Sequence, residues 1–273
     1  MKLKGVLRRI VESSGYSLVK VRKASAKNAE RSALPVLPAA DAPYEQDGLR
    51  SIHIHEFMRE PAFCRAYERG CRAASDYKWH WRVHIGLWAA FTASKLKGDF
   101  VECGVNRGFL SSAIMELLDW NSLNKTFYLL DTFEGLDQEQ VSEDELKQGA
   151  MEKSRSRLED GFYVRGVESV KANFAEWKNV HIIQGSVPGT LAAVPSPQVA
   201  YLHLDMNCAP PEVAALDHFW DRLVPGAVVL MDDYAFWHCE PQKHVLDAFA
   251  REKHVLIASL PTGQGLLLKP PTG

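Results

Sequence analysis

The sequence predicts an α/β fold with a doubly wound sheet of seven mostly parallel strands and a C-terminal antiparallel hairpin. From Gly98 onward, short apolar runs alternate with helical stretches. Runs that are apolar at nearly every position are typical of parallel strands buried on both faces. The last two runs lie so close together that they must pair as a hairpin, so at least one is antiparallel. A length of 273 residues with 46% hydrophobic content suits a sizeable core.

The elements follow in order from the apolar runs. Apolar spacing predicts a helix over 211–223 that ends at Val-Pro-Gly. The segment 137–161 is highly charged, and a lid over a site or a solvated helix both fit it. The strands are predicted at 99–105, 127–133, 180–187, 199–206, 227–234, 255–261 and 266–270.

Two segments precede the sheet domain, which we place at 98–273. Residues 1–47 combine an amphipathic helix at 2–13 with a proline-containing linker. Residues 48–97 are helical in pattern and rich in aromatic side chains, which predicts an N-terminal helical cap. Contact of the helix at 2–13 with a membrane surface, with the protein's own body or with a second subunit of a homodimer all remain open.

Charge and cysteine content limit the partners and the compartment. A net charge of -2 gives no expectation of a nucleic-acid partner, although residues 1–32 hold nine Lys and Arg against two Glu. The five cysteines form no CxxC pair, which indicates reduced thiols. With no secretory signal pattern and no long apolar run, we expect a cytoplasmic protein, with peripheral contact at the inner membrane surface as an open addition.

The first strand of the sheet runs into a turn that suits a ligand. Gly104 and Gly108 let the backbone approach a bound group closely, and Asn106 lies between them. A diphosphate cradle would need a third glycine. Glu102, two residues before the first glycine, instead suits a cationic amino-acid group.

The next two strands complete a predicted nucleoside site. Asp131 ends the second strand, where ribose hydroxyls are bound in such folds. Thr132 and Phe133 follow, and the phenyl ring is placed to stack near an adenosine. Gly185 and Ser186 end the third strand, beside the expected adenine. The alternative is that Asp131 only caps a loop.

Three aspartates predict a metal site at the same edge. Asp205 closes the fourth strand, and Asp232 and Asp233 close the fifth. Neighbouring parallel strands end about 5 Å apart, so the three carboxylates would repel one another unless a cation joined them. Oxygen ligands favour Mg²⁺, with Mn²⁺ or Ca²⁺ as substitutes. The alternative is a zinc site formed by Cys208, Cys239 and His238.

Three motifs carry a family resemblance. GDFVECGVNRG at 98–108, LLDTFEGL at 129–136 and the stretch 204–234 closely resemble the macrocin O-methyltransferase (TylF-like) family of class I methyltransferases. The resemblance covers about residues 95–270. It implies a Rossmann-like fold, the cofactor S-adenosyl-L-methionine, magnesium, and methylation of a sugar hydroxyl.

The resemblance also implies roles for individual residues. Glu102 and Gly104 would face the methionine part of the cofactor and Asp131 its ribose. The metal ligands would be Asp205, Asp232 and Asp233, with Asp205 also the leading general base and His238 the alternative. The sequence departs from the family pattern at 206–211 and 235–244, where the acceptor would bind, which counts against a macrolide sugar.

The expected acceptor is a sugar or glycoside, carried on a polysaccharide, a glycolipid or a secondary metabolite. Two alternative functions remain open: a nucleotide-sugar-modifying enzyme with an aspartate-based metal site, and a catalytically silent cofactor-binding or scaffold protein. The aromatic side chains of the cap and of the last long loop either form a sugar-stacking wall or belong to the core. The residues concerned are Trp79, His80, Trp81, Arg82, Tyr234 and Trp237.

Overall fold

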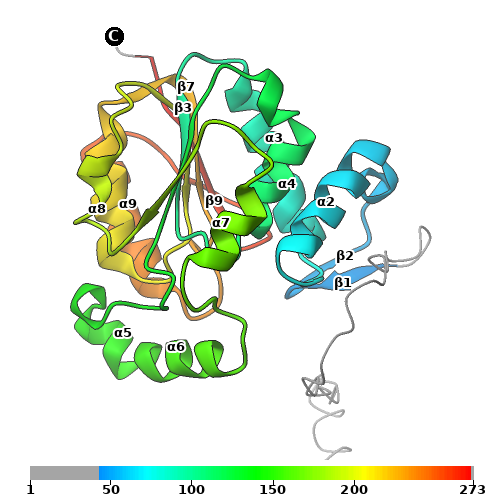
Figure 1. Cartoon of the computed structure of the whole chain (residues 1–273). Coiled ribbons are helices and arrows are strands. Elements are labelled where there is room, and N and C mark those ends of the chain that lie inside the picture. Colours follow the sequence, from blue (N-terminus) through cyan, green and yellow to red (C-terminus); the bar gives the residue numbers. More distant parts are fainter. Residues whose placement is uncertain (1–42, 272–273) are drawn as a thin grey trace, which may run out of the picture. The chain divides into compact units, whose positions relative to one another are not determined.

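A seven-stranded sheet organises the protein, of which the computed structural model describes residues 43–271. The strand order is β5-β4-β3-β6-β7-β9-β8 (Figure 1). The first five of these strands pair in parallel, and β9 is antiparallel to both β7 and β8. The predicted fold and hairpin are therefore confirmed. The strands are β3 Asp99–Cys103, β4 Phe127–Asp131, β5 Val180–Gln184, β6 Val199–Leu204, β7 Leu223–Met231, β8 Ala258–Ser259 and β9 Gly265–Leu268.

Helices cover both faces of the sheet and create two apolar cores. Successive side chains of a strand point to opposite faces, so Phe100 joins one core and Val101 the other. Figure 1 shows α3, α4 and α7 on one face and α8 and α9 on the other. These helices are α3 His80–Ser94, α4 Phe109–Leu117, α7 Glu168–Phe174, α8 Ala209–Trp220 and α9 Glu240–Glu252. Both α8 and α9 carry proline in their first turn, where its missing N–H costs nothing.

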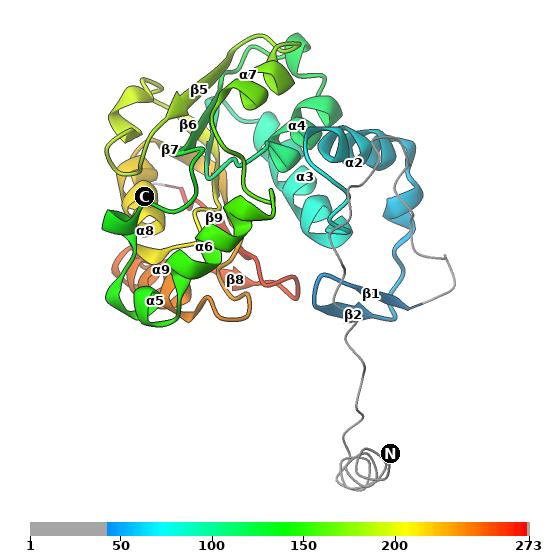
Figure 2. The ribbon, with the colours of Figure 1, turned by 60° about the horizontal axis from the view of Figure 1, so that its bottom comes forward.

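The N-terminal part of the described chain contains helices, but it begins with a hairpin that was not predicted, at residues expected to belong to the linker and to the start of the cap. β1 Tyr44–Gln46 and β2 Leu49–Ser51 are joined by Asp47 and Gly48, both at positive φ, as a two-residue hairpin turn requires. The 3-10 helix Glu56–Arg59 and α2 Pro61–Ala73 follow. α2 packs on α4, and α3 packs on β6 and β7 (Figure 2).

Two segments differ from, or extend, the predicted boundaries. α8 ends at Trp220, and Val-Pro-Gly at 224–226 belongs to β7 instead of ending the helix. The charged insert forms α5 Glu143–Lys147 and α6 Ala150–Glu159, which Figure 1 shows at the end of the sheet where the loop after β4 runs. Ser142 and Glu145 form a capping box at the start of α5.

The predictions of an N-terminal amphipathic helix, of no membrane span and of reduced cysteines are compared with the described residues in turn. The amphipathic helix predicted at 2–13, with its membrane or dimer contact, lies outside the described residues. Within 43–271, no helix is both long enough and apolar enough to cross a membrane. All five cysteines lie within the described residues, and none of them forms a disulfide there.

Candidate active site

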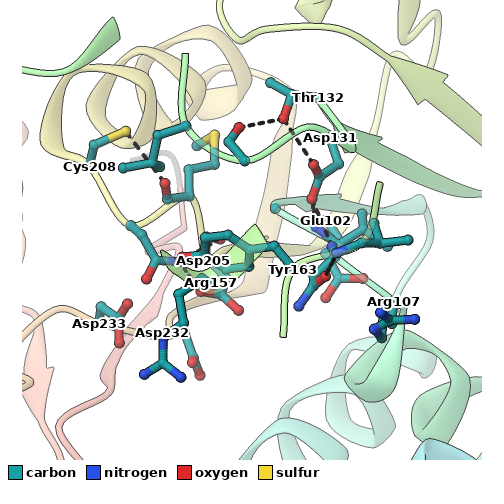
Figure 3. A pocket seen from close by; sticks show the side chains of 18 of the residues that line it. Glu102, Arg107, Asp131, Thr132, Arg157, Tyr163, Asp205, Cys208, Asp232 and Asp233 are labelled. Atoms are coloured by element: carbon teal, nitrogen blue, oxygen red, sulfur yellow. Dashed lines mark hydrogen bonds between the residues drawn. The ribbon is translucent and has the colours of Figure 1, made fainter. Parts of the chain in front are cut away.

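A cavity of about 420 Å³ opens at the carboxyl ends of the central strands. The strand order reverses between β3 and β6, and such a switch point is where open α/β sheets bind ligands. Figure 3 shows Glu102 and Asp131 on one side of this pocket and the aspartates after β6 and β7 on the other. Most of the predicted site residues line it, namely Glu102, Gly104, Asn106, Asp131, Thr132, Phe133, Gly185, Ser186, Asp205, Asp232 and Asp233.

The glycine turn after β3 is held against the end of β6. Gly104 has φ +93°, and a Cβ atom there would lie 1.9 Å from the carbonyl oxygen of Asp205. Only glycine fits such a close approach of two backbones. Gly108 begins α4 at φ +80°, but it does not line the pocket, and a Cβ there would strike the ring of Phe174. The structure therefore explains Gly108 by helix packing and gives it no place in the pocket.

Asp131 binds the backbone of the turn. Its Oδ2 accepts hydrogen bonds from the N–H groups of Val105 and Asn106, both at 2.7 Å, and its Oδ1 accepts one from Phe133 at 2.6 Å. Loop capping, the alternative considered for this residue, is thus one of its roles. The carboxylate also lines the pocket, and carboxylate oxygens accept more than one hydrogen bond each. Asp131 can therefore hold the turn and a ligand hydroxyl together.

Asn106 positions another part of the pocket wall. Its Nδ2 donates to the carbonyl of Phe162 at 3.0 Å, and its Oδ1 accepts from the N–H of Val164 at 2.9 Å. These two bonds fix the segment that carries Tyr163 into the pocket. The side chain of Asn106 is thereby committed to the loop after α6.

The turns after β4 and β5 form the far wall. Phe133 is buried at φ +54° in the core, and Thr132 precedes it. The N–H of Gly185 donates to the carbonyl of Asp131 at 2.9 Å, which ties the two turns together. The hydroxyl of Ser186 donates to Asp137 at 2.5 Å.

The opposite wall is acidic. Asp232 and Asp233 are 6% and 8% exposed at the end of β7, and Asp205 lies beside them after β6. Burial, together with the charges of Asp232 and Asp233, raises the pKa of Asp205 well above its ordinary value. Asn207 Nδ2 donates to Asp205 Oδ1 at 3.2 Å and orients the carboxylate.

Arg82 of α3 forms ion pairs with the acidic wall, by which we mean Asp205, Asp232 and Asp233, through the last two of these residues. Its Nη1 donates to Asp232 Oδ2 and lies 3.5 Å from Asp233 Oδ1, while its Nε donates to Asp47 Oδ2 at 3.2 Å. Burial favours the neutral form of Asp232, but Arg82 and His203 outweigh it and hold the pKa of this carboxyl well below its usual range. Burial and then Asp232 raise the pKa of Asp233.

As placed, these side chains do not fit a divalent cation. Within the described residues, no group of three His, Cys, Asp or Glu side chains is arranged to hold a metal ion. Asp232 already binds Arg82 through one oxygen and Gln264 through the other. Neither the predicted magnesium site nor the alternative zinc cluster is formed by this arrangement.

His238 does not reach the pocket. It is exposed at φ +68°, and its ring stacks on that of Trp237 with the centroids 4.1 Å apart. Trp237 itself is 79% exposed. Of the aromatic and basic side chains considered for a wall, Trp79 and Arg82 line the pocket. The structure therefore brings Asp205, and not His238, to the site.

A buried Glu102–His203 pair was missed by sequence reasoning. The two residues are directly paired in the register of β3 and β6, and Glu102 Oε1 lies 2.8 Å from His203 Nδ1. Both line the pocket, and Glu102 Oε2 is buried without a hydrogen-bond partner among the described residues. A signal was present, since each is a polar residue inside an otherwise apolar strand.

His203 makes the stability of the fold depend on pH. Burial lowers its pKa, but interactions with Asp232 and Glu102 outweigh that effect and raise it from 6.5 to about 10. A raised pKa stabilises the folded state fully below pH 6.5, and this contribution is lost as the pH rises through about 10. The free energy of unfolding should therefore fall over that range, and His203→Gln should flatten the fall.

Urea unfolding at several pH values measures this effect. His181→Gln, on the exposed edge strand β5, is the control and should keep the wild-type pH profile. An identical profile for His203→Gln and the wild type would contradict a charged His203.

The fold and the pocket define the class of protein: a doubly wound α/β protein with a pocket at the switch point of its sheet. Residues 87–260 match the profile of the macrocin-O-methyltransferase (TylF) family, and the chain belongs to this family.

Two curated relatives and two solved structures extend the comparison. The 8-demethyl-8-(2,3-dimethoxy-alpha-L-rhamnosyl)-tetracenomycin-C 4'-O-methyltransferase of Streptomyces olivaceus is 29% identical over 157 residues, 56% of this chain and 59% of the relative. The mycinamicin III 3''-O-methyltransferase of Micromonospora griseorubida is 24% identical over 154 residues, 54% of this chain and 59% of the relative. The match thus spans about three fifths of each relative.

Solved structures show the same fold. The O-methyltransferase NovP has a TM-score of 0.59 at 20% identity, covering 70% of this chain and 80% of its own. The calicheamicin methyltransferase CalS11 has a TM-score of 0.54 at 16% identity, covering 79% of this chain and 94% of its own. Both support the Rossmann-like fold that the sequence predicted.

Proposed function

We propose that this protein transfers a methyl group from S-adenosyl-L-methionine to a hydroxyl of a sugar or glycoside. The observation that carries the proposal is the pocket itself, in which an unpartnered carboxylate oxygen of Glu102, the Gly104 turn and Asp131 lie across from Asp205. Family membership supports methyl transfer. Both curated relatives are named as O-methyltransferases, and the name of the Streptomyces olivaceus relative includes a rhamnosyl group, which supports the acceptor class.

The cofactor fits the wall formed by β3, β4 and β5. Glu102 Oε2 is buried and lacks a partner within residues 43–271, and a buried carboxylate in that state needs a donor such as the ammonium group of the methionine part. Asp131 is placed to accept from ribose hydroxyls, as acidic residues at this position of such folds do. Gly185 and Ser186 lie where the adenine would rest.

Asp205 is the base in this proposal. S-adenosyl-L-methionine supplies the electrophilic methyl group. Asp205 in its ionised form accepts the proton of the acceptor hydroxyl, and its raised pKa makes that ionised form a stronger base than an ordinary carboxylate. Asn207 holds the carboxylate in one orientation. The pocket walls align the acceptor oxygen with the methyl carbon, and such alignment supplies much of the rate.

Magnesium assistance, with manganese as a substitute, stays a prediction. It rests on the family resemblance and on three carboxylates at one edge of the sheet. The arrangement of Asp232 with Arg82 and Gln264 does not provide a cation site, so no step of the proposed mechanism passes through a metal.

Glu102→Gln tests the cofactor half. The variant should bind S-adenosylhomocysteine about 10- to 100-fold more weakly, because it loses a charge-assisted hydrogen bond to the ammonium group. Calorimetry gives the dissociation constants, and wild-type protein should gain several degrees in Tm at saturation. Glu212→Gln is a matched control, since Glu212 is also fully buried with an unpartnered Oε2 but does not line the pocket.

No binding of S-adenosylhomocysteine to the wild type would end the proposal. The acceptor half needs a separate experiment, in which methyl transfer from labelled cofactor is screened over glycosides and cell-envelope extracts. If the protein binds S-adenosylhomocysteine but transfers no methyl group to any glycoside, the cofactor half of the proposal stands and the proposed acceptor class is wrong.

A further inference from the structure

Arg82 occupies the place at the acidic wall where a cation would bind. It comes from α3, 150 residues before Asp232 in the chain, and its Nη1 donates to Asp232 Oδ2. The same nitrogen lies 3.5 Å from Asp233 Oδ1. Arg82 and both aspartates are less than a tenth exposed. Buried charges of this kind are stable only when they are paired, so this guanidinium offsets one of the two negative charges of the aspartate pair, and His203 lies 3.8 Å from the other oxygen of Asp232.

The second oxygen of Asp232 is also taken. Gln264 Nε2 donates to Asp232 Oδ1 at 2.8 Å. Thr262 Oγ1 donates to Gln264 Oε1 at 2.9 Å, which fixes the amide with its nitrogen toward the aspartate. Both carboxylate oxygens of Asp232 therefore have protein donors.

The guanidinium is held in place on its remaining sides. Its central carbon lies 4.7 Å from the ring centroid of Phe236 and 5.6 Å from that of Trp79, within the range of cation–π attraction. Nε donates to Asp47 in the β1–β2 turn. A buried, planar group fixed by aromatic rings and carboxylates loses little entropy by staying where it is.

We infer that Arg82 is the resident counter-cation of Asp232 and Asp233, and that a divalent cation can bind this pair only by displacing it. The guanidinium and a metal ion would use the same oxygen of Asp232 and would repel each other at that distance. The affinity of the protein for divalent metal is therefore set by Arg82. This inference concerns metal binding alone and stands whether or not the acceptor is a sugar.

Titration with Mn²⁺, followed by the paramagnetic resonance signal of the free ion, tests the inference on the full chain. Arg82→Gln should bind Mn²⁺ about tenfold or more tightly than the wild type, because the pair loses its competitor. Arg82→Lys keeps the charge but loses the planar fork, so its affinity should fall between the two. Equal Mn²⁺ affinity of wild type and Arg82→Gln, or weaker binding by the variant, would overturn the inference.

Arg69→Gln is the matched control. Arg69 is also a buried arginine of the N-terminal helices, with Glu176 at 2.9 Å and the Trp177 ring 4.5 Å away, but it lies outside the pocket. Its removal should leave Mn²⁺ affinity at the wild-type value. An equal gain in affinity for Arg69→Gln would assign the effect to general loosening and reject a specific role for Arg82.

Thermal unfolding gives an independent readout. Arg82→Gln leaves the buried carboxylates of Asp232 and Asp233 without this partner and should lower the Tm by roughly 5–10 °C. Arg69→Gln removes a pair whose other member, Glu176, is exposed, so its loss should be smaller. Mn²⁺ should restore part of this loss in Arg82→Gln and none of the loss in Arg69→Gln. If Arg82→Gln does not fold, Arg82→Met replaces it. If neither folds, an Arg82→Lys affinity no greater than that of the wild type overturns the inference.

Discussion

Gly104→Ala is expected to lower the free energy of unfolding by about 4 kcal/mol, a loss at the upper end of what single substitutions cause. An added Cβ would lie 1.9 Å from the backbone oxygen of Asp205, and backbone cannot turn aside as a flexible side chain can. The positive φ of +93° adds about 1 kcal/mol of strain for any residue with a Cβ. Urea unfolding measures the change, and binding of S-adenosylhomocysteine should be lost with it.

Gly161→Ala separates the two causes. Gly161 also has positive φ, at +77°, but nothing lies within 4 Å of an added Cβ. It should cost about 1 kcal/mol, the conformational part alone. Similar losses for the two variants would mean that β3 and β6 do not meet as closely as described.

The contact at Gly104 explains why the two halves of the site are adjacent. The N–H of Asp205 donates to the carbonyl of Cys103 at 2.8 Å, so the turn proposed to face the cofactor and the proposed base are joined by one backbone hydrogen bond. If β3 were shifted against β6 by one residue, every side chain of β3 would point to the opposite face of the sheet. Glu102 would then leave the pocket, and its pairing with His203 would be lost.

Local sequence patterns predicted most of this fold. Strands buried on both faces give apolar runs that stand out, and the C-terminal pair was recognisable from its short connection alone. The β1–β2 hairpin was not predicted because each of its strands has only three residues, too few for a pattern. The start of β7 was missed because Val-Pro-Gly is a typical helix stop.

Site residues that lie at the ends of strands could be predicted from the sequence. Contacts between residues that are far apart in the chain could not. Asp131 and Asp205 lie at strand ends, and both line the same pocket. Arg82 reaches Asp232 across 150 residues, and no spacing in the chain encodes that contact. Gly108 and His238 were predicted as site residues because they lie near the site in sequence, but neither lines the pocket. Nearness in sequence does not decide which way a residue faces.

Asp205→Asn is expected to reduce the rate of methyl transfer by about 10²- to 10⁴-fold, the usual contribution of a general base. Asparagine has nearly the same shape but accepts no proton from the acceptor hydroxyl. The affinity for S-adenosylhomocysteine should change by less than about threefold, since the proposed cofactor wall is formed by β3, β4 and β5 and an amide keeps the shape of the pocket. Turnover with labelled cofactor and calorimetry of the same samples measure the two quantities.

Two further variants serve as controls for the assignment of Asp205 as the general base. Asp247→Asn removes a carboxylate that pairs with Lys243 and Tyr234 outside the pocket, and it should retain wild-type turnover. His238→Ala should also retain it, because the imidazole is exposed and does not line the pocket. A large loss in His238→Ala with turnover intact in Asp205→Asn would transfer the role to the histidine. It would also require the loop after β7 to close over the pocket when the acceptor binds, because the imidazole lies outside the pocket in this structure.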